Sequence, residues 1–160
     1  MLRAVAAAKP ACPDPVTMLA VVERRLRALD AQVAHLQLLG MDHVSLPITD
    51  AARTRAFYEA ALQPLGWTCS GMRPGVYVGF KKPGSPALYF HVTEHVQPAH
   101  RAFKAASREQ VAAFHRAALD AGGRDNGAPG PRPSYGAAYF AAFAYDPDGH
   151  NVEAVVDGVG

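Results

Sequence analysis

The sequence DPDGHNVEAVV, residues 146–156, carries the strongest local signals for fold and chemistry in this chain of 160 residues. Asp146-Pro147-Asp148-Gly149 has strong turn chemistry and lies between two apolar runs, so it predicts a hairpin that joins strands at 139–145 and 151–156. In the second strand, Glu153 is surrounded by apolar residues, where an unpaired carboxylate is costly. A bound metal, a salt bridge or an edge position facing water removes that cost. Glu153 is therefore a candidate metal ligand, and the other two explanations stay open.

An internal repeat lies upstream of this hairpin. When the chain is shifted by 57 residues, one apolar helical segment falls on another, with these identical pairs: Ala56 and Ala113, Phe57 and Phe114, Ala60 and Ala117, Ala61 and Ala118, Leu62 and Leu119, Gly66 and Gly123. The helix-capping residues Asp50 and Ser107 also correspond. Self-similarity of this kind indicates two copies of one supersecondary unit.

Both copies show the same expected order of elements. In the first copy, the pattern predicts a strand at 42–48, a helix from the Asp50 cap to about Leu62, and strands at 76–80 and 87–92. In the second copy, it predicts a strand at 99–105, a helix from Ser107 to about Ala121, a loop rich in Gly and Pro at 124–133, and the hairpin. We therefore expect an α+β fold of paired βαβββ modules that form a cupped mixed sheet with a metal cleft.

Two histidines correspond under the same shift. His43 falls on His100, and each lies on the strand that opens its unit, so the two can face each other across the cleft. Together with Glu153 they form a candidate site of two imidazoles and one carboxylate. Such a set suits one divalent ion (Zn, Ni, Mn, Co or Fe(II)) and leaves positions open for water and substrate. The alternative is that both histidines are structural.

The segment before this domain has a different pattern of apolar and polar residues. Residues 1–40 are expected to form an N-terminal extension with an amphipathic helix at about 15–39, and residues 41–160 the domain. Apolar residues follow a heptad-like spacing in the helix, at Leu19, Val22, Leu26, Leu29, Val33 and Leu36. Such a stripe packs on the protein's own sheet or on a partner subunit, and both readings stay open.

Composition limits the class of protein. A net charge of +2, scattered Lys and Arg, and no nucleic-acid-binding motif argue against a nucleic-acid partner. No apolar run approaches the roughly 20 residues needed to span a membrane. Cys12 and Cys69 form no CxxC pair and support no disulfide framework, a cysteine usage that fits a reducing compartment or is indifferent to it, and we expect a cytoplasmic protein. A weak transit-peptide signal at residues 1–12, basic and without acids, stays as an alternative.

Several short motifs resemble one family. The sequence resembles the vicinal oxygen chelate superfamily, which includes glyoxalase I, extradiol dioxygenases and bleomycin-resistance proteins. The resemblance covers about Met41 to Val156 and is carried by MDHV at 41–44, RAFY at 55–58, VAAFH at 111–115, GGRDNG at 122–127 and, most specifically, DPDGHNVE at 146–153. The N-terminal helix is an addition to the family pattern.

The resemblance implies a ligand set. His43, His100 and Glu153 match three of the family's four metal positions, and the fourth falls on Leu88 or Tyr89. Neither residue is a carboxylate, which departs from the His/Gln-Glu-His-Glu set of glyoxalase I. The three that remain resemble the 2-His-1-carboxylate set of extradiol dioxygenases.

The resemblance also implies a reaction class, with a substrate chelated through two vicinal oxygens. By position, Glu153, Tyr139 and His91 are candidates for proton transfer. Candidate substrate contacts are Phe140 and Ala142, expected on the same face as Glu153, together with Tyr89 and a lid formed by Arg132 and Tyr135. Arg101 and Lys104 interrupt an otherwise apolar strand, and either face water at an edge or contact an anion.

Three functions follow from these features. The first is a divalent-metal-dependent lyase, isomerase or dioxygenase that acts on a small substrate, as a homodimer. The second is a small-molecule-binding protein of the bleomycin-resistance type without catalysis. The third is a scaffold without metal, held as a dimer partly by the N-terminal helix.

Overall fold

The computed structural model describes residues 14–37 and 41–158 of the chain. Its first βαβββ module comprises β1 (His43–Ile48), α2 (Ala51–Leu62), a short 3-10 turn η1 (Gln63–Leu65), β2 (Thr68–Arg73), β3 (Tyr77–Lys81) and β4 (Ala87–Val92). The strands form a four-stranded sheet in the order β1-β4-β3-β2, in which β1 is parallel to β4 and the other pairs are antiparallel.

The second module repeats this plan. It comprises β5 (His100–Lys104), α3 (Arg108–Asp120), β6 (Arg124–Pro131), β7 (Phe140–Tyr145) and β8 (Asn151–Val156). The sheet order is β5-β8-β7-β6, in which β5 is parallel to β8 and the other pairs are antiparallel. The α+β fold of paired modules and the extra N-terminal helix, α1 (Pro15–Gln37), are therefore confirmed. Within the described residues the strands form two separate four-stranded sheets.

Two strands were not predicted. No strand is expected from the sequence at Thr68–Arg73, where the structure has β2, and a loop is expected at Arg124–Pro131, where it has β6. Both are edge strands, and both have irregular register with their neighbours, at Cys69/Gly71 in β2 and around Gly127 in β6. Glycine and proline are tolerated at edges and bulges, so the composition of β6 concealed its pairing.

Local signals explain the two module helices. The Asp50 side chain accepts hydrogen bonds from Ala52 N and Arg53 N at 2.8 and 2.9 Å, and Ser107 accepts one from Gln110 N at 3.3 Å. These bonds satisfy N–H groups that a helix start leaves free. Both predicted caps are therefore confirmed.

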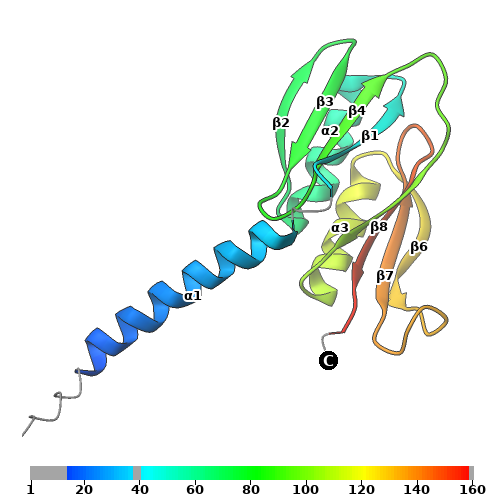
Figure 1. Cartoon of the computed structure of the whole chain (residues 1–160). Helices are drawn as coiled ribbons and strands as arrows, with labels where there is room; N and C mark the ends of the chain where they lie inside the picture. The colour runs from blue at the N-terminus through cyan, green and yellow to red at the C-terminus, as the bar shows by residue number, and fades with distance from the viewer. Residues whose placement is uncertain (1–13, 38–40, 159–160) are drawn as a thin grey trace, which may run out of the picture.

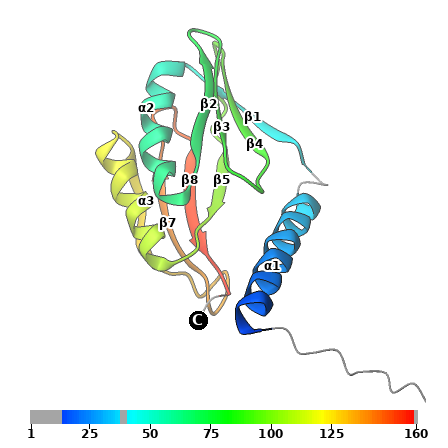
Figure 2. The same cartoon turned by 90° about the vertical axis from the view of Figure 1, so that its left-hand side faces the viewer.

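The hydrophobic core lies on the helix side of both sheets. Helices α2 and α3 pack against each other, and each also packs against the strands of its own module (Figures 1 and 2). Phe57 and Phe114, which correspond in the repeat, are both fully buried. Gly123, just after α3, allows Phe57 of α2 to approach closely, because a Cβ at residue 123 would lie 2.7 Å from Phe57 Cε2. The opposite face of each sheet is left open.

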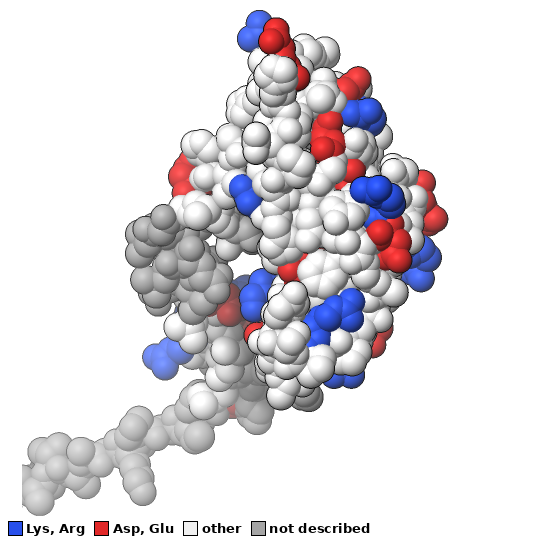
Figure 3. Space-filling view, turned by 90° about the vertical axis from the view of Figure 1, so that its right-hand side faces the viewer, with Lys and Arg blue, Asp and Glu red and all other residues white. Residues whose placement is uncertain are grey.

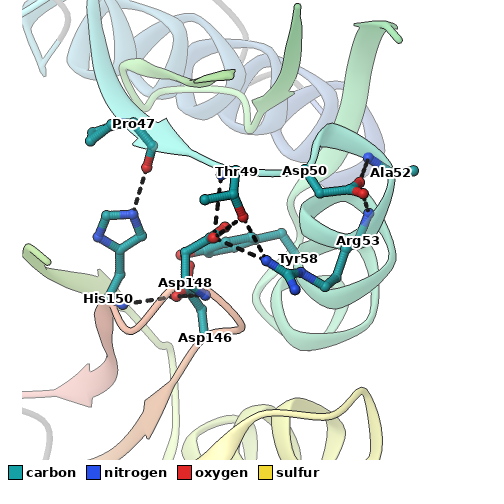
Figure 4. Close-up of polar contacts among 9 residues, drawn as sticks. All are labelled: Pro47, Thr49, Asp50, Ala52, Arg53, Tyr58, Asp146, Asp148 and His150. Carbon is teal, nitrogen blue, oxygen red and sulfur yellow. Dashed lines mark hydrogen bonds and ion pairs between the residues drawn. The ribbon is translucent and has the colours of Figure 1, made fainter. Parts of the chain in front are cut away.

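A polar junction connects the two modules (Figure 4). His150 accepts a hydrogen bond on Nδ1 from Ala99 N at 3.0 Å, so its proton is on Nε2, which donates to the Pro47 carbonyl at 2.8 Å. Asp148 Oδ1 accepts from Thr49 N and from Arg53 Nη2 at 3.2 and 3.0 Å. The turn that precedes Glu153 is thereby fixed to the first strand and helix.

Helix α1 extends away from the two modules (Figure 1). Asp14 accepts from Val16 N and Thr17 N, both at 3.0 Å, as a cap before Pro15. The expected helix end at about residue 39 and the transit-peptide signal at residues 1–12 fall outside the described residues. No helix of the described segments is both long and apolar enough to cross a membrane.

Candidate metal and substrate site

Glu153 points from β8 toward the open face of the second sheet. Its side chain is only 4% exposed, and Tyr139 donates a 2.6 Å hydrogen bond to Oε1. A buried carboxylate needs further partners to offset its lost hydration. Its second oxygen, Oε2, faces His100 Nε2 at 3.1 Å.

His100 is oriented by its other ring nitrogen. Nδ1 lies 3.2 Å from the Asn151 carbonyl, which can only accept a hydrogen bond. Nδ1 therefore carries a proton, and the neutral ring presents an Nε2 lone pair to the Glu153 carboxylate. Two acceptors face each other unless the ring takes up a second proton or a cation lies between them.

The pair formed by His100 Nε2 and Glu153 Oε2 suits a divalent ion. Imidazole nitrogen and carboxylate oxygen are ligands for the expected metals, with bond lengths of about 2.0–2.2 Å for Zn. Because His100 Nε2 and Glu153 Oε2 lie 3.1 Å apart, both atoms can bind one such ion. Within this chain the residues present thus fit part of a metal site, namely two protein ligands.

Aromatic side chains surround the pair. A hollow of about 400 Å³ is lined by His100, Tyr135, Tyr139, Phe143, Asn151 and Glu153. Partial burial, with the hydrogen bond to Glu153, raises the pKa of Tyr139 to about 12. Tyr139 therefore stays protonated at neutral pH and acts as a donor.

The first module has a corresponding hollow of about 240 Å³, lined by His43, Ser45, Tyr77, Tyr89 and His91. Register decides between the two candidates for the fourth family position. Tyr89 pairs with Ser45 on β1 as Glu153 pairs with Ala102 on β5, so Tyr89 is the counterpart of Glu153 and Leu88 lies on the core side. Tyr89 packs edge-on against His43 at 5.7 Å between ring centroids.

The three predicted metal ligands do not meet within one chain. His100 and Glu153 are adjacent, whereas His43 lines the other hollow, with its Nδ1 2.7 Å from Asp42 Oδ2. Residues 14–37 and 41–158 contain no cluster of three His, Cys, Asp or Glu side chains with metal-site geometry. The expectation that the two histidines face each other across one cleft is thus not met in a single chain, because His43 and His100 each lie on the open face of their own sheet.

The predicted face of two substrate-contact residues was wrong. Ala142 is fully buried on the helix side of β7, where it pairs with Ala154. Phe140 lies under the Arg108 guanidinium of α3, 5.1 Å from its carbon to the ring centroid. Side chains alternate along a strand, and Phe143 is the residue that pairs with Glu153. Because Tyr145 pairs with Asn151, the connection holds five residues, one more than the four-residue DPDG turn, and this shifts the register by one residue and moves Phe140 and Ala142 to the other face.

The predicted lid residues differ in position. Tyr135 is 66% exposed at the rim of the Glu153 hollow, with its ring 5.4 Å from that of Tyr139. Arg132 instead stacks on Phe143 at 5.4 Å and donates to the Ala128 carbonyl at 2.7 Å. It supports the wall of the hollow from outside.

Three residues with a part in the Glu153 hollow were missed by sequence reasoning, and one of them is Asn151, which lines the hollow and accepts the hydrogen bond from His100 Nδ1. Phe143 forms a wall of the hollow, and buried His150 fixes the turn that leads into β8. The only signal for His150 was its place directly after the DPDG turn.

On the face shown in Figure 3, basic and acidic side chains are interspersed.

Comparison with known proteins connects this geometry to one family. Residues 40–154 match the family model described as Glyoxalase/Bleomycin resistance protein/Dioxygenase superfamily. No curated protein sequence matches the chain significantly.

Solved structures share the fold. A glyoxalase/bleomycin resistance protein from Albidiferax ferrireducens is similar with a TM-score of 0.63 and 26% identity, over 72% of this chain and 97% of that one. A glyoxalase-related enzyme from Fulvimarina pelagi has a TM-score of 0.62 and 20% identity, over 77% and 94%. A lactoylglutathione lyase from Agrobacterium tumefaciens has a TM-score of 0.57 and 18% identity, over 73% and 92%. The last two, at this identity, show the fold alone.

Proposed function

The chain belongs to the Glyoxalase/Bleomycin resistance protein/Dioxygenase superfamily, and from this premise we propose that it is a divalent-metal-dependent enzyme. The reaction is a lyase, isomerase or dioxygenase step on a small substrate that chelates the ion through two adjacent oxygens. One observation carries this proposal: His100 Nε2 and the buried Glu153 Oε2 face each other at 3.1 Å, an arrangement that either a proton or a bound cation between the two atoms would stabilise.

The ion would be held by His100 and Glu153 of one chain and by His43 of a second copy. His43 lies on the open face of the first sheet, as His100 does on the second, so two chains can bring the faces together. A homodimer with two equivalent sites satisfies this arrangement, since each chain supplies one half to each site. Bound, the ion supplies Lewis-acid polarisation of the substrate oxygens.

The chain's own residues then divide the remaining tasks. Tyr139 holds Glu153 Oε1, so that Oε2 is directed to the His100 side of the hollow. Glu153 is the candidate base, and the Tyr139 phenol, which stays protonated at neutral pH, donates a hydrogen bond to it. His91 and Tyr89 come from the first module and reach the site only as part of the second copy.

Metal analysis of purified protein tests the ligand assignment. We expect one ion per chain in the wild type and loss of the ion in His100→Ala and Glu153→Gln. His95→Ala is the matched control, because His95 is exposed and lines neither hollow. Wild-type protein that takes up no Zn, Ni, Mn, Co or Fe(II) after reconstitution would refute the proposal.

A complementation experiment tests the shared site. His43→Ala and Glu153→Gln chains each lose the ion as homodimers. A mixed dimer recovers one intact site, formed by His43 of the Glu153→Gln chain and by His100 and Glu153 of the His43→Ala chain. We expect one ion per mixed dimer, whereas retention of metal by His43→Ala alone would contradict a role for His43.

Tyr89 supports a second candidate function. The position that corresponds to Glu153 holds a phenol that packs on His43, so the first half of the site lacks a carboxylate. Such a cleft can hold a ligand without turning it over, as a bleomycin-resistance-type binding protein does. Metal-loaded protein assayed with hemithioacetals and catechols separates the two: turnover supports the enzyme, and saturable binding without turnover supports the binding protein.

A further inference from the structure

The apolar stripe of α1 has no partner within the described chain. Leu19, Val22, Leu26 and Leu29 are 59%, 47%, 55% and 56% exposed. A helix of 23 residues in water draws little stability from propensity alone and is normally held by packing of such a stripe. In the sequence, the stripe continues with the same spacing at Val33 and Leu36.

The spacing identifies the class of partner. Steps of three and four residues from Leu19 place the apolar residues at heptad positions a and d, the seam of a two-helix coiled coil. A helix that covers a sheet needs a broader apolar face than this. The flanking e positions then hold Glu23 and Asp30, and a g position holds Arg25.

Charges on the flanks select the orientation. In a parallel pair, residue g of one helix faces residue e of the next heptad on the other, so Arg25 faces Asp30 twice. In an antiparallel pair with full overlap, e positions face each other, so Glu23 faces Asp30 and like charges meet. We propose that α1 pairs in parallel with α1 of a second copy of this chain, through the seam that begins at Leu19.

Cysteine cross-linking in the full chain tests the register. A parallel pair places Leu26 against Leu26, whereas the antiparallel pair places it against Leu29. In a Cys12→Ala/Cys69→Ser background, we expect Leu26→Cys to form a disulfide-linked dimer on mild oxidation and Arg24→Cys, on the outer face, to form little. Equal cross-linking of the two variants overturns the proposal. The readout is local to α1, so it is independent of the metal site.

Charge reversal provides a second test. Asp30→Arg and Arg25→Asp each place like charges across a parallel pair and reduce cross-linking of Leu26→Cys. Mixing the two variants restores both ion pairs, so mixed dimers form in preference to either homodimer. If Asp30→Arg instead increases dimer formation, the helices pair antiparallel and the proposal is wrong.

A separate observation concerns Arg101, which faces the helix side of β5 rather than solvent. Its Nη1 donates to the His100 carbonyl at 2.6 Å, but its buried Nε has no hydrogen-bond partner and its guanidinium no ion pair among the described residues. Of the carboxylates in this region, Asp146 is held by Tyr58 and Asp148 by Arg53, although Asp148 Oδ2 is also unpaired.

Arg101 lines a hollow between the modules with a volume of about 240 Å³. Two more cations, Lys82 and Lys104, line it, and its walls include Trp67 and Phe103, which contact each other edge-on at 5.4 Å. The hollow shares no lining residue with either half of the metal site. We infer that it binds a small organic monoanion with an apolar body, whose acid group pairs with Arg101.

Trp67 is the only tryptophan of the chain, so its fluorescence reports on this hollow. We expect octanoate to change Trp67 emission with saturation, and the uncharged octanamide to bind more weakly. Arg101→Met should weaken octanoate binding about tenfold to a hundredfold, as for loss of a charge-assisted hydrogen bond. Arg73→Met, an exposed arginine outside the hollow, is the control. No saturable response, or an equal response in Arg101→Met, overturns the assignment and favours an internal, water-bridged pairing of Arg101 with Asp148.

Discussion

The substitution Tyr58→Phe removes one hydrogen-bond donor, the Tyr58 hydroxyl, from the buried centre of the protein and leaves the ring in place. Tyr58 is 1% exposed, and its hydroxyl donates to Asp146 Oδ2 at 2.9 Å. The other oxygen, Oδ1, accepts from Asp148 N and His150 N at 2.9 and 2.8 Å. Oδ2 has no other donor among the described residues, so the variant leaves half of a buried carboxylate without a partner.

The expected cost follows from that geometry. The phenyl ring keeps its packing, so the loss is that of one hydrogen bond to a charged group, about 2 kcal/mol in the free energy of unfolding. For a domain of this size that lowers the melting temperature by roughly 8 °C. Tyr145→Phe is the control, since its hydroxyl makes no hydrogen bond in the described structure, and we expect a change within about 0.5 kcal/mol.

The cost should also depend on pH. Burial raises the pKa of Asp146 above its ordinary value, and the Tyr58 hydrogen bond opposes that rise. A group with a raised pKa in the folded state gives stability that is complete at low pH and is lost as pH rises through that pKa. The variant raises the pKa of Asp146 further, so its cost is full where Asp146 is ionised and shrinks as pH falls through the raised pKa.

Urea unfolding, followed by Trp67 fluorescence at neutral and progressively lower pH, measures both effects. A midpoint shift no larger than that of Tyr145→Phe would refute the assignment of Asp146 as a buried, ionised acceptor. So would a cost of 2 kcal/mol that stays constant down to acid pH, since this would mean that the hydroxyl acts through packing alone.

Three further predictions concern other parts of the fold. The pKa of Tyr139 is raised from 10.0 to about 12, so the contribution of Tyr139 to the free energy of unfolding is complete below pH 10 and is lost as pH approaches 12. Tyr139→Phe should abolish both this loss of stability and the phenolate absorbance step near pH 12. Gly123→Ala should cost about 1–3 kcal/mol in urea unfolding, because its Cβ would lie 2.7 Å from Phe57 Cε2; no loss would show that α2 and α3 can separate freely. Arg53→Met should cost about 1–2 kcal/mol, because it leaves the Asp148 carboxylate, whose side chain is 3% exposed, without its ion-pair partner, whereas Asp148→Asn should cost less than about 1 kcal/mol, because the amide oxygen still accepts from Thr49 N and Arg53 Nη2. Equal costs in thermal unfolding would contradict that ranking.

The sequence predicted the modules because their signals are local. Caps at Asp50 and Ser107, the apolar stripe of each helix and the DPDG turn each depend on a few neighbouring residues. The strand β6 escaped prediction because its backbone is held by pairing with β7 and not by its own composition. Gly127, at a φ of 147°, sits at one of its register shifts, and no propensity reveals such an arrangement.

The candidate site was predictable only in part for a different reason. A repeat relation identified His100 and His43 as equivalents, and the cost of burying a carboxylate identified Glu153. Equivalence in a repeat places two residues on corresponding faces, but it does not say whether those faces meet within one chain or between two. That depends on how α2 packs against α3, which no single motif encodes.

The two halves of the repeat also show why fold and chemistry can diverge separately. Along each sheet, residues that fix the fold alternate with residues that face the hollow, because side chains of a strand alternate between its faces. Phe57 and Phe114 stayed identical on the helix side, while the open-face pair is His43 with Tyr89 in one module and His100 with Glu153 in the other. Replacing a carboxylate by a phenol on the open face leaves the core untouched, so one module can lose a metal ligand without losing stability. The prediction is that Glu153→Tyr folds as stably as the wild type to within about 1 kcal/mol, while it binds no metal, because the hollow of about 400 Å³ beside residue 153 has room for the phenol and the cost of burying a carboxylate is removed. A large loss of stability in urea unfolding would mean that Glu153 supports the fold as well as the site.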